Sequence, residues 1–244
     1  MSRGGDSRRP SLLGDTARAH AMLFEKPMAP THGAAAGMRM LVAFLAVGVG
    51  VFFALRWAIA RTWVHDSPTS RLVFVGALLL AFVVVQRFFV ATTWAAVGLR
   101  RFASWTRRER LYLAQMIPLA AVMFSFLFRG HVRSLVEQHG LAGFLLVSVP
   151  TGLLWGMVQE FLYRGWLQTE LTRRFGSVAG LLAANAAFTF GPLHSVYLFG
   201  AGGVRWGVLA AVFGIGLIFS ILYRRSGNLW IPAVLHGLWP LNMA

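Results

Sequence analysis

Apolar residues occur in this chain in long runs, and these runs predict its structure. An α-helix needs about 20 predominantly apolar residues to cross the hydrocarbon core of a bilayer. Short polar or glycine-containing segments separate the runs from one another. The runs predict helices at residues 38–58, 72–91, 111–128, 141–167, 178–194, 206–223 and 229–241. We therefore expect an all-α fold, a polytopic membrane helical bundle of about seven transmembrane helices.

Composition supports this fold class, because 57% of the 244 residues are hydrophobic and the mean hydropathy is +0.63. A water-soluble domain does not have such a composition. Residues 1–37 are rich in Gly, Arg, Ser, Ala and Pro without apolar periodicity, which predicts a disordered basic tail. We expect accessory transmembrane helices at 38–140 and a four-helix core at 141–244, which leaves no room for a second folded domain.

The net charge of +15 bears on topology rather than on nucleic-acid binding, since the arginines are dispersed at the ends of the predicted spans. The tail and alternate loops carry fifteen of the 23 Lys and Arg residues, and the opposite loops carry six. Under the positive-inside rule this bias predicts a cytoplasmic N-terminus. We expect an integral protein of the bacterial plasma membrane, in contact with the lipid bilayer and with no nucleic-acid partner.

Charged residues inside the fourth predicted span are the best indication of function. Glu160 and Arg164 are four residues apart and share one helix face, whereas Gln159 points about 100° away from Glu160. Charge at membrane depth costs several kcal/mol and survives mainly in pairs or beside polar cavities. The residues therefore indicate a functional site, or alternatively an ion pair that only joins this helix to a neighbour.

Two histidines in later spans are predicted to lie near Glu160. Gly176 predicts a tight turn between the fourth and fifth helices, and counting from it places Glu160 and His194 about 3 Å apart in height. A second turn at residues 226–228 precedes His236, which reaches a similar depth if the fourth and fifth helices protrude into the cytoplasm. Taken singly, each histidine is more typical of a helix-packing hydrogen bond than of a functional site.

These residues resemble the motifs of the CPBP intramembrane proteases (ABI family), which include CAAX prenyl proteases of the Rce type and bacteriocin-processing proteins. The first motif, EExxxR, corresponds to residues 159–164, and FxxxH corresponds to Phe190 through His194. The third motif is a histidine followed four residues later by Asn or Asp, and it corresponds to His236. The resemblance covers about residues 141–242.

The resemblance implies that the first glutamate and the FxxxH histidine activate a water for attack on a peptide bond. The third-motif histidine and its Asn or Asp are implied to stabilise the oxyanion. The chain departs from the motifs twice, with Gln159 at the first glutamate and Pro240 at the Asn or Asp position. The candidate catalytic residues are Glu160, His194, His236, Arg164, Gln159 and Asn242.

The leading function is an intramembrane endopeptidase (a hydrolase) that cleaves a membrane-associated protein or peptide substrate in or near a membrane segment or C-terminus. The alternatives are a catalytically inactive family member that binds such a protein or peptide, and a small transporter or channel. We expect no cofactor, although His194, His236 and Glu160 leave a divalent metal such as zinc open. Asn185 and Thr189 are expected to form helix-packing hydrogen bonds, with a secondary site role open for Asn185. Gln86 is expected to reach toward the headgroups.

Overall fold

The computed structural model describes residues 32–59, 67–127, 129–200 and 203–238, and this part of the chain is almost entirely helical. Its α-helices are α2 (Ala34–Ile59), α4 (Pro68–Val84), α5 (Arg107–Leu127), α6 (Arg129–Gly143), α7 (Val149–Glu160), α8 (Thr169–Phe175), α9 (Ser177–Phe190), α10 (Pro192–Leu198), α11 (Trp206–Ser226) and α12 (Trp230–Leu238). Shorter elements are the π-helical segments η1 (Val85–Val90), η4 (Phe144–Ser148) and η5 (Phe161–Gln168) and the 3₁₀ turns η2 (Trp94–Val97) and η3 (Phe102–Ser104). Two strands of two residues each, β1 (Phe199–Gly200) and β2 (Gly203–Val204), form an antiparallel pair. The all-α prediction is confirmed.

Four helical stretches within the described residues are long and apolar enough to cross a membrane, which fits an integral membrane protein. They are Ala34–Ala54, Thr69–Val90, Arg129–Phe175 and Trp206–Ser226. The other three predicted spans are also helical where the structure describes them, but α9 and the described part of α12 are short, and α5 begins with four charged residues. The predicted count of seven transmembrane helices is therefore not confirmed.

The fourth predicted span is part of a long rod that runs from α6 to the end of α8. The rod bends at Gly140, whose φ of 69° and ψ of 165° are not helical. Beyond that kink the chain passes through η4, α7, η5 and α8 without leaving a helical conformation. The residues from Phe161 to Gln168 form a π-helical segment, a local widening that occurs frequently at functional sites.

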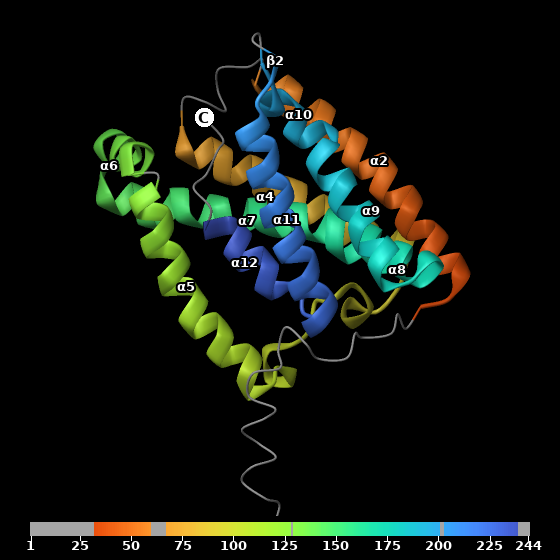
Figure 1. The fold of residues 1–244 in the computed structure, drawn as a ribbon. Coiled ribbons are helices and arrows are strands. Elements are labelled where there is room, and N and C mark those ends of the chain that lie inside the picture. The colour runs from red at the N-terminus through yellow and green to blue at the C-terminus, as the bar shows by residue number, and fades with distance from the viewer. Residues whose placement is uncertain (1–31, 60–66, 128, 201–202, 239–244) are drawn as a thin grey trace, which may run out of the picture.

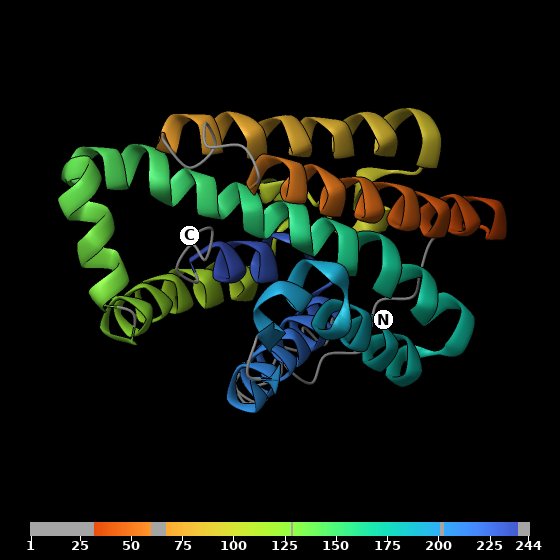
Figure 2. The ribbon, with the colours of Figure 1, turned by 90° about the horizontal axis from the view of Figure 1, so that it is seen from above.

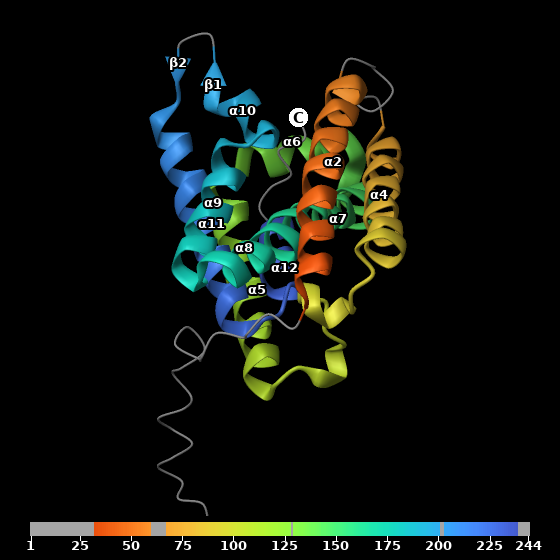
Figure 3. The same ribbon diagram turned by 90° about the vertical axis from the view of Figure 1, so that its right-hand side faces the viewer.

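The helices form two groups around this rod. Figure 2 shows α2, α4 and the α7–η5 part of the rod side by side, in agreement with the contacts of α2 with η5 and of α4 with α7. On the other side of the rod α9 packs against α11, and both are seen together in Figure 3. The short helix α12 lies against both α7 and α5, and α5 is followed by α6, the bent first part of the rod (Figure 1).

The fifth predicted span, 178–194, is interrupted rather than continuous. Helix α9 ends at Phe190, Gly191 is extended with ψ 167°, and Pro192 starts the separate helix α10. Proline disfavours the helical conformation of the residue before it, which accounts for the break. The prediction of one helix reaching His194 was therefore wrong, and His194 lies on α10.

The core of the bundle is aromatic where η5 meets α4. Phe161 and Trp166 pack against Phe82, with the Phe82 and Trp166 rings stacked at 5.2 Å. The indole Nε1 of Trp166 donates to Oε1 of Gln86 at 2.8 Å, and Gln86 is completely buried. The expectation that Gln86 reaches the headgroups was therefore wrong, because its amide satisfies a tryptophan inside the bundle.

Candidate active site

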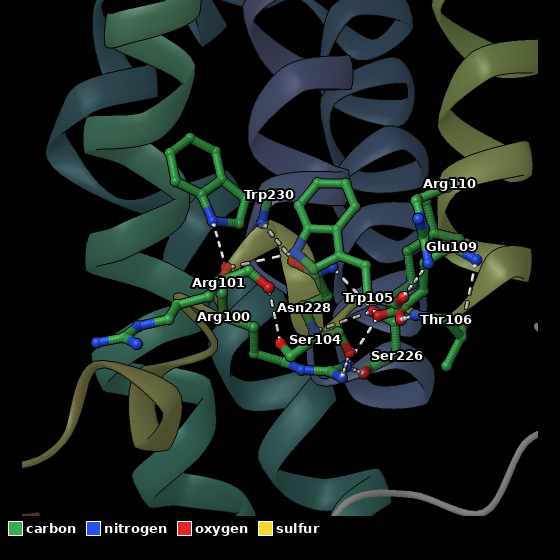
Figure 4. Close-up of polar contacts among 11 residues, drawn as sticks. Arg100, Arg101, Ser104, Trp105, Thr106, Glu109, Arg110, Ser226, Asn228 and Trp230 are labelled. Carbon is green, nitrogen blue, oxygen red and sulfur yellow. Dashed lines mark hydrogen bonds and ion pairs between the residues drawn. The ribbon is translucent and has the colours of Figure 1, made fainter.

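A polar clamp fixes the start of α12, the helix that carries His236. Gly227 ends α11 in the left-handed conformation with φ 60°, as expected for the glycine of a tight turn. The next residue, Asn228, is fully buried, and its Nδ2 donates to Oε1 of Glu109 at 3.1 Å. The same oxygen accepts from Nη1 of Arg100 at 2.9 Å, and Oε2 accepts from the Thr106 backbone N–H at 2.7 Å. Figure 4 shows this carboxylate joining the α11–α12 turn to residues from the 100–109 segment.

Close contact between α7 and α12 brings the two helices that carry Glu160 and His236 together. A Cβ added to Gly156 would lie 2.5 Å from the Gly237 backbone nitrogen and 2.6 Å from the Ala233 carbonyl oxygen. Small residues such as glycine and alanine at a helix crossing permit the backbones of two membrane helices to approach closely. Glu160 follows Gly156 by one helical turn and His236 immediately precedes Gly237, so the crossing sets the distance between their side chains.

The Glu160 carboxylate is completely buried and interacts with two side chains. Its Oε1 lies 2.7 Å from Nδ1 of His236. Its Oε2 lies 3.2 Å from Nε of Arg164, an ion pair that lacks hydrogen-bond geometry. Arg164 is also completely buried, donates through Nη2 to the Gly216 carbonyl at 2.8 Å, and places its guanidinium carbon 4.2 Å from the centre of the Phe188 ring. The predicted pairing of Glu160 with Arg164 is present.

Phe188 connects the two histidines. Its ring centre lies 4.3 Å from that of His194 and 5.7 Å from that of His236. The Nδ1 of His194 lies 2.6 Å from the Phe188 carbonyl oxygen, which can only accept, so Nδ1 carries the proton. His194 therefore adjoins Arg164 and His236 through the Phe188 ring, and it is carried by α10 rather than by a continuous fifth helix.

Exposure distinguishes the members of this cluster. The side chain of His236 is 13% exposed, whereas that of Glu160 is 0% exposed. The ring of His236 also stacks on Phe219 at 5.3 Å, which fixes its plane. A molecule entering the site therefore meets His236, and the carboxylate behind it holds the imidazole in one orientation.

Residues 141–241 match the family model described as Type II CAAX prenyl endopeptidase Rce1-like. This segment, which makes up less than half of the chain, is similar to the Rce1-like family. No curated protein and no solved structure matches the chain. The Rce1-like family is a family of proteases, so the resemblance inferred from the motifs is confirmed.

The Rce1-like segment contains every candidate residue that the structure describes, and most of them are brought together. Glu160, Arg164, His194 and His236 converge around Phe188, as described above. Gln159 is 4% exposed, and its Oε1 has no hydrogen-bond partner among the described residues. Asn242 and Pro240 lie outside the described residues. The catalytic roles of all these residues remain predictions.

A metal does not fit the donors of the Rce1-like site as they are arranged. Within the described residues no group of three His, Asp or Glu side chains is placed as a ligand set. Of the three residues considered for zinc, Glu160 directs one oxygen at a guanidinium, whose positive charge opposes a divalent cation. We therefore derive no step through a metal.

Several residues that shape the site escaped prediction from the sequence. Phe188 lies between Arg164 and both histidines, whereas Phe190 of the FxxxH motif is 57% exposed. The Gly216 carbonyl receives Arg164, and a Cβ added to Gly216 would lie 2.4 Å from Oδ1 of Asn185, so the Asn185 side chain would have to shift. The Gly156 and Gly237 crossing was also missed. Glycines four residues apart, at 152 and 156, were the available signal for it.

Proposed function

We propose that this protein is an intramembrane endopeptidase that hydrolyses a peptide bond in or near a membrane segment or C-terminus of a membrane-associated protein. The observation that carries the proposal is the 2.7 Å contact between Oε1 of Glu160 and Nδ1 of His236 in a buried, largely apolar setting. The family match supports the reaction class.

The contact assigns different roles to the two residues. A carboxylate that accepts from Nδ1–H leaves Nε2 as the basic atom of the imidazole and stabilises the imidazolium that forms when Nε2 takes a proton. Glu160 is completely buried, with one oxygen at His236 and the other at Arg164. In our proposal His236 is therefore the general base, and Glu160 is a positioning residue.

The proposed reaction begins when Nε2 of His236 accepts a proton from a water molecule. The resulting hydroxide forms a bond to the peptide carbonyl carbon, and the carbonyl oxygen becomes an oxyanion. When the tetrahedral intermediate collapses, the carbon–nitrogen bond breaks and the imidazolium returns the proton to the leaving amine. His194, whose Nε2 is likewise the unprotonated nitrogen, supplies a second proton acceptor beside Phe188.

One observation favours a second candidate, a non-catalytic family member that binds a membrane protein or peptide. Gln159 occupies the position of the first glutamate of the family motif, and its buried amide cannot accept a proton from water. In that case the same cluster would be a structural site, and substrate would bind without being cleaved.

A cleavage assay separates the two candidates. The protein in lipid nanodiscs is mixed with a panel of membrane-anchored peptides, and cleavage is followed by mass spectrometry for the wild type and for Glu160→Gln, His236→Ala, His194→Ala and Gln159→Glu. His139→Ala serves as the matched control, because this histidine lies on α6 outside the cluster. Wild-type cleavage that His236→Ala abolishes and His139→Ala preserves supports the proposal. Binding without cleavage, with cleavage gained in Gln159→Glu, supports the non-catalytic member.

A further inference from the structure

A row of buried polar atoms lies on the last residue of α7 and on η5, α9 and α11, which pack together. Six side chains contribute atoms that have no hydrogen-bond partner among the described residues. They are Oε2 of Glu160, Nε and Nη1 of Arg164, Oε1 of Gln168, Oδ1 of Asn185, Oγ1 of Thr189 and Oγ of Ser220. Each of these residues is at most 2% exposed, so the surrounding helices enclose them. We call this row the polar seam.

Contacts to α11 place three side chains of the polar seam along one helix. Arg164 donates through Nη2 to the Gly216 carbonyl at 2.8 Å, and Gln168 donates through Nε2 to the Ser220 carbonyl at 2.9 Å. From the other side Asn185 donates to the Phe213 carbonyl at 3.1 Å, and its Oδ1 lies against Gly216. The three carbonyls lie within about 10 Å along α11, since a helix rises about 1.5 Å per residue.

Competition for one carbonyl explains why the Ser220 hydroxyl lacks a hydrogen-bond partner among the described residues. A serine inside a helix ordinarily donates its hydroxyl to the carbonyl four residues earlier. For Ser220 that carbonyl belongs to Gly216, which instead accepts from Arg164. The hydroxyl therefore remains available on the inner face of α11, beside the seam.

We propose that the polar seam is an internal water-binding site that reaches the carboxylate of Glu160. A buried polar atom without a partner costs about 1–3 kcal/mol, and buried water normally supplies the missing bonds in native proteins. The seam presents donors on Arg164, acceptors on Asn185 and Gln168, and hydroxyls that do both. Water matches such a mixed set because each molecule both donates and accepts.

Ions do not match the polar seam. The charges of Glu160 and Arg164 offset each other, so the seam has no net charge for an ion to neutralise. An anion would face the amide oxygens of Asn185 and Gln168, and a cation would face the guanidinium of Arg164. Both arrangements are electrostatically unfavourable at low dielectric.

The position of the seam gives the water a role, which rests on the proposed function. Hydrolysis consumes one water per peptide bond, and a site within the bilayer cannot draw that water from the surrounding lipid. Because the seam ends at Glu160, whose other oxygen holds His236, it provides a local supply next to the proposed base.

Water contact at Asn185 can be measured without any assay of activity. The chain contains three asparagines, Asn185, Asn228 and Asn242, so labelling asparagine side-chain nitrogen with ¹⁵N gives a simple solid-state NMR spectrum in bilayers. Asn228 is the matched control, since it is equally buried and its amide is satisfied by Glu109 and the Trp230 backbone N–H. We expect magnetisation to pass from water to the Asn185 amide several-fold faster than to that of Asn228. Equally slow transfer of magnetisation from water to Asn185 and to Asn228 would overturn the proposed water-binding site.

A variant tests the role of the water separately. Asn185→Leu removes two polar groups from the seam at similar volume. We expect slow cleavage with substrate binding unchanged, and a further loss of rate in the double variant with Ser220→Ala. If Asn185 is hydrated in the NMR experiment and the variants cleave at the wild-type rate, the seam binds water but does not supply it for hydrolysis. If the wild type cleaves nothing, the proposed function fails and the NMR result still decides the site.

Discussion

Gly156 of α7 and Gly237 of α12 approach so closely that a Cβ at either position would lie 2.5 Å from the opposite backbone. This contact sets the separation of Glu160 and His236, which each lie within about one turn of it. We predict that Gly156→Ala forces the helices apart, because the clash is with backbone that cannot rotate away. Overpacking of this kind costs about 1–3 kcal/mol.

The measurement is the thermal unfolding midpoint in detergent, with Gly76→Ala as the control. Gly76 lies on α4, where an added Cβ meets nothing within 4 Å. The midpoint should fall for Gly156→Ala and hold or rise for Gly76→Ala. Equal midpoints for the two variants would show that α7 and α12 are not in close contact.

The buried ion pair of Glu160 and Arg164 predicts a large effect when one partner is removed. Glu160→Gln leaves the Arg164 guanidinium charged and completely buried without its counter-charge. Breaking a buried pair in this way costs about 3–5 kcal/mol. Replacing both partners, as Glu160→Gln with Arg164→Met, should recover part of that loss, because no uncompensated charge remains.

An exposed pair on α6 provides the control for this prediction. Arg133 and Glu137 have the same four-residue spacing as Glu160 and Arg164, and their side chains are 80% and 60% exposed. Glu137→Gln should change the unfolding free energy very little, since exposed pairs contribute little. If chemical unfolding shows that Glu137→Gln and Glu160→Gln lower the unfolding free energy by similar amounts, the distinction between the exposed and the buried pair is contradicted.

Apolar runs predicted the helices well because a membrane helix is defined by composition over about 20 residues, which is visible in a single sequence. Pairing of Glu160 with Arg164 followed equally from local spacing. The glycine turns at 176 and 227 were also correct, with φ values of 81° and 60°. These features depend only on residues close together in the chain.

Features that depend on distant segments were not predictable in the same way. Helix counting placed His194 opposite Glu160, but the break at Gly191 and Pro192 puts His194 on a separate helix. The partner of Glu160 is instead His236, which reaches it through the α7–α12 crossing. The glycines at 152 and 156 indicate a close helix contact but not which helix makes it, and the position of Phe188 leaves no periodic signal in the sequence.

The clamp at Glu109 predicts that a residue far from the site controls the position of His236. Glu109 accepts from Arg100, Thr106 and Asn228 with an exposed fraction of only 3% (Figure 4). Glu109→Gln replaces one accepting oxygen with an N–H group that faces a donor, which costs about 1–3 kcal/mol.

Hydrogen exchange of the α12 amides measures this effect, and Ser104→Ala is the control, because that exposed hydroxyl donates only to the Arg101 carbonyl. Exchange in residues 230–238 should accelerate in Glu109→Gln and remain as in the wild type in Ser104→Ala. Unchanged exchange in both variants would mean that the clamp does not hold α12.

The central claim is that Nε2 of His236 takes the proton from water while Glu160 orients the ring. Chemical rescue tests it most directly, because His236→Ala opens a space beside Glu160 that free imidazole can occupy. We predict that cleavage of a membrane-anchored peptide falls by about 10²–10⁴-fold in His236→Ala, the usual contribution of a general base, and that added imidazole restores part of it. Cleavage by His236→Ala at the wild-type rate, or a loss that imidazole does not relieve, would contradict the account.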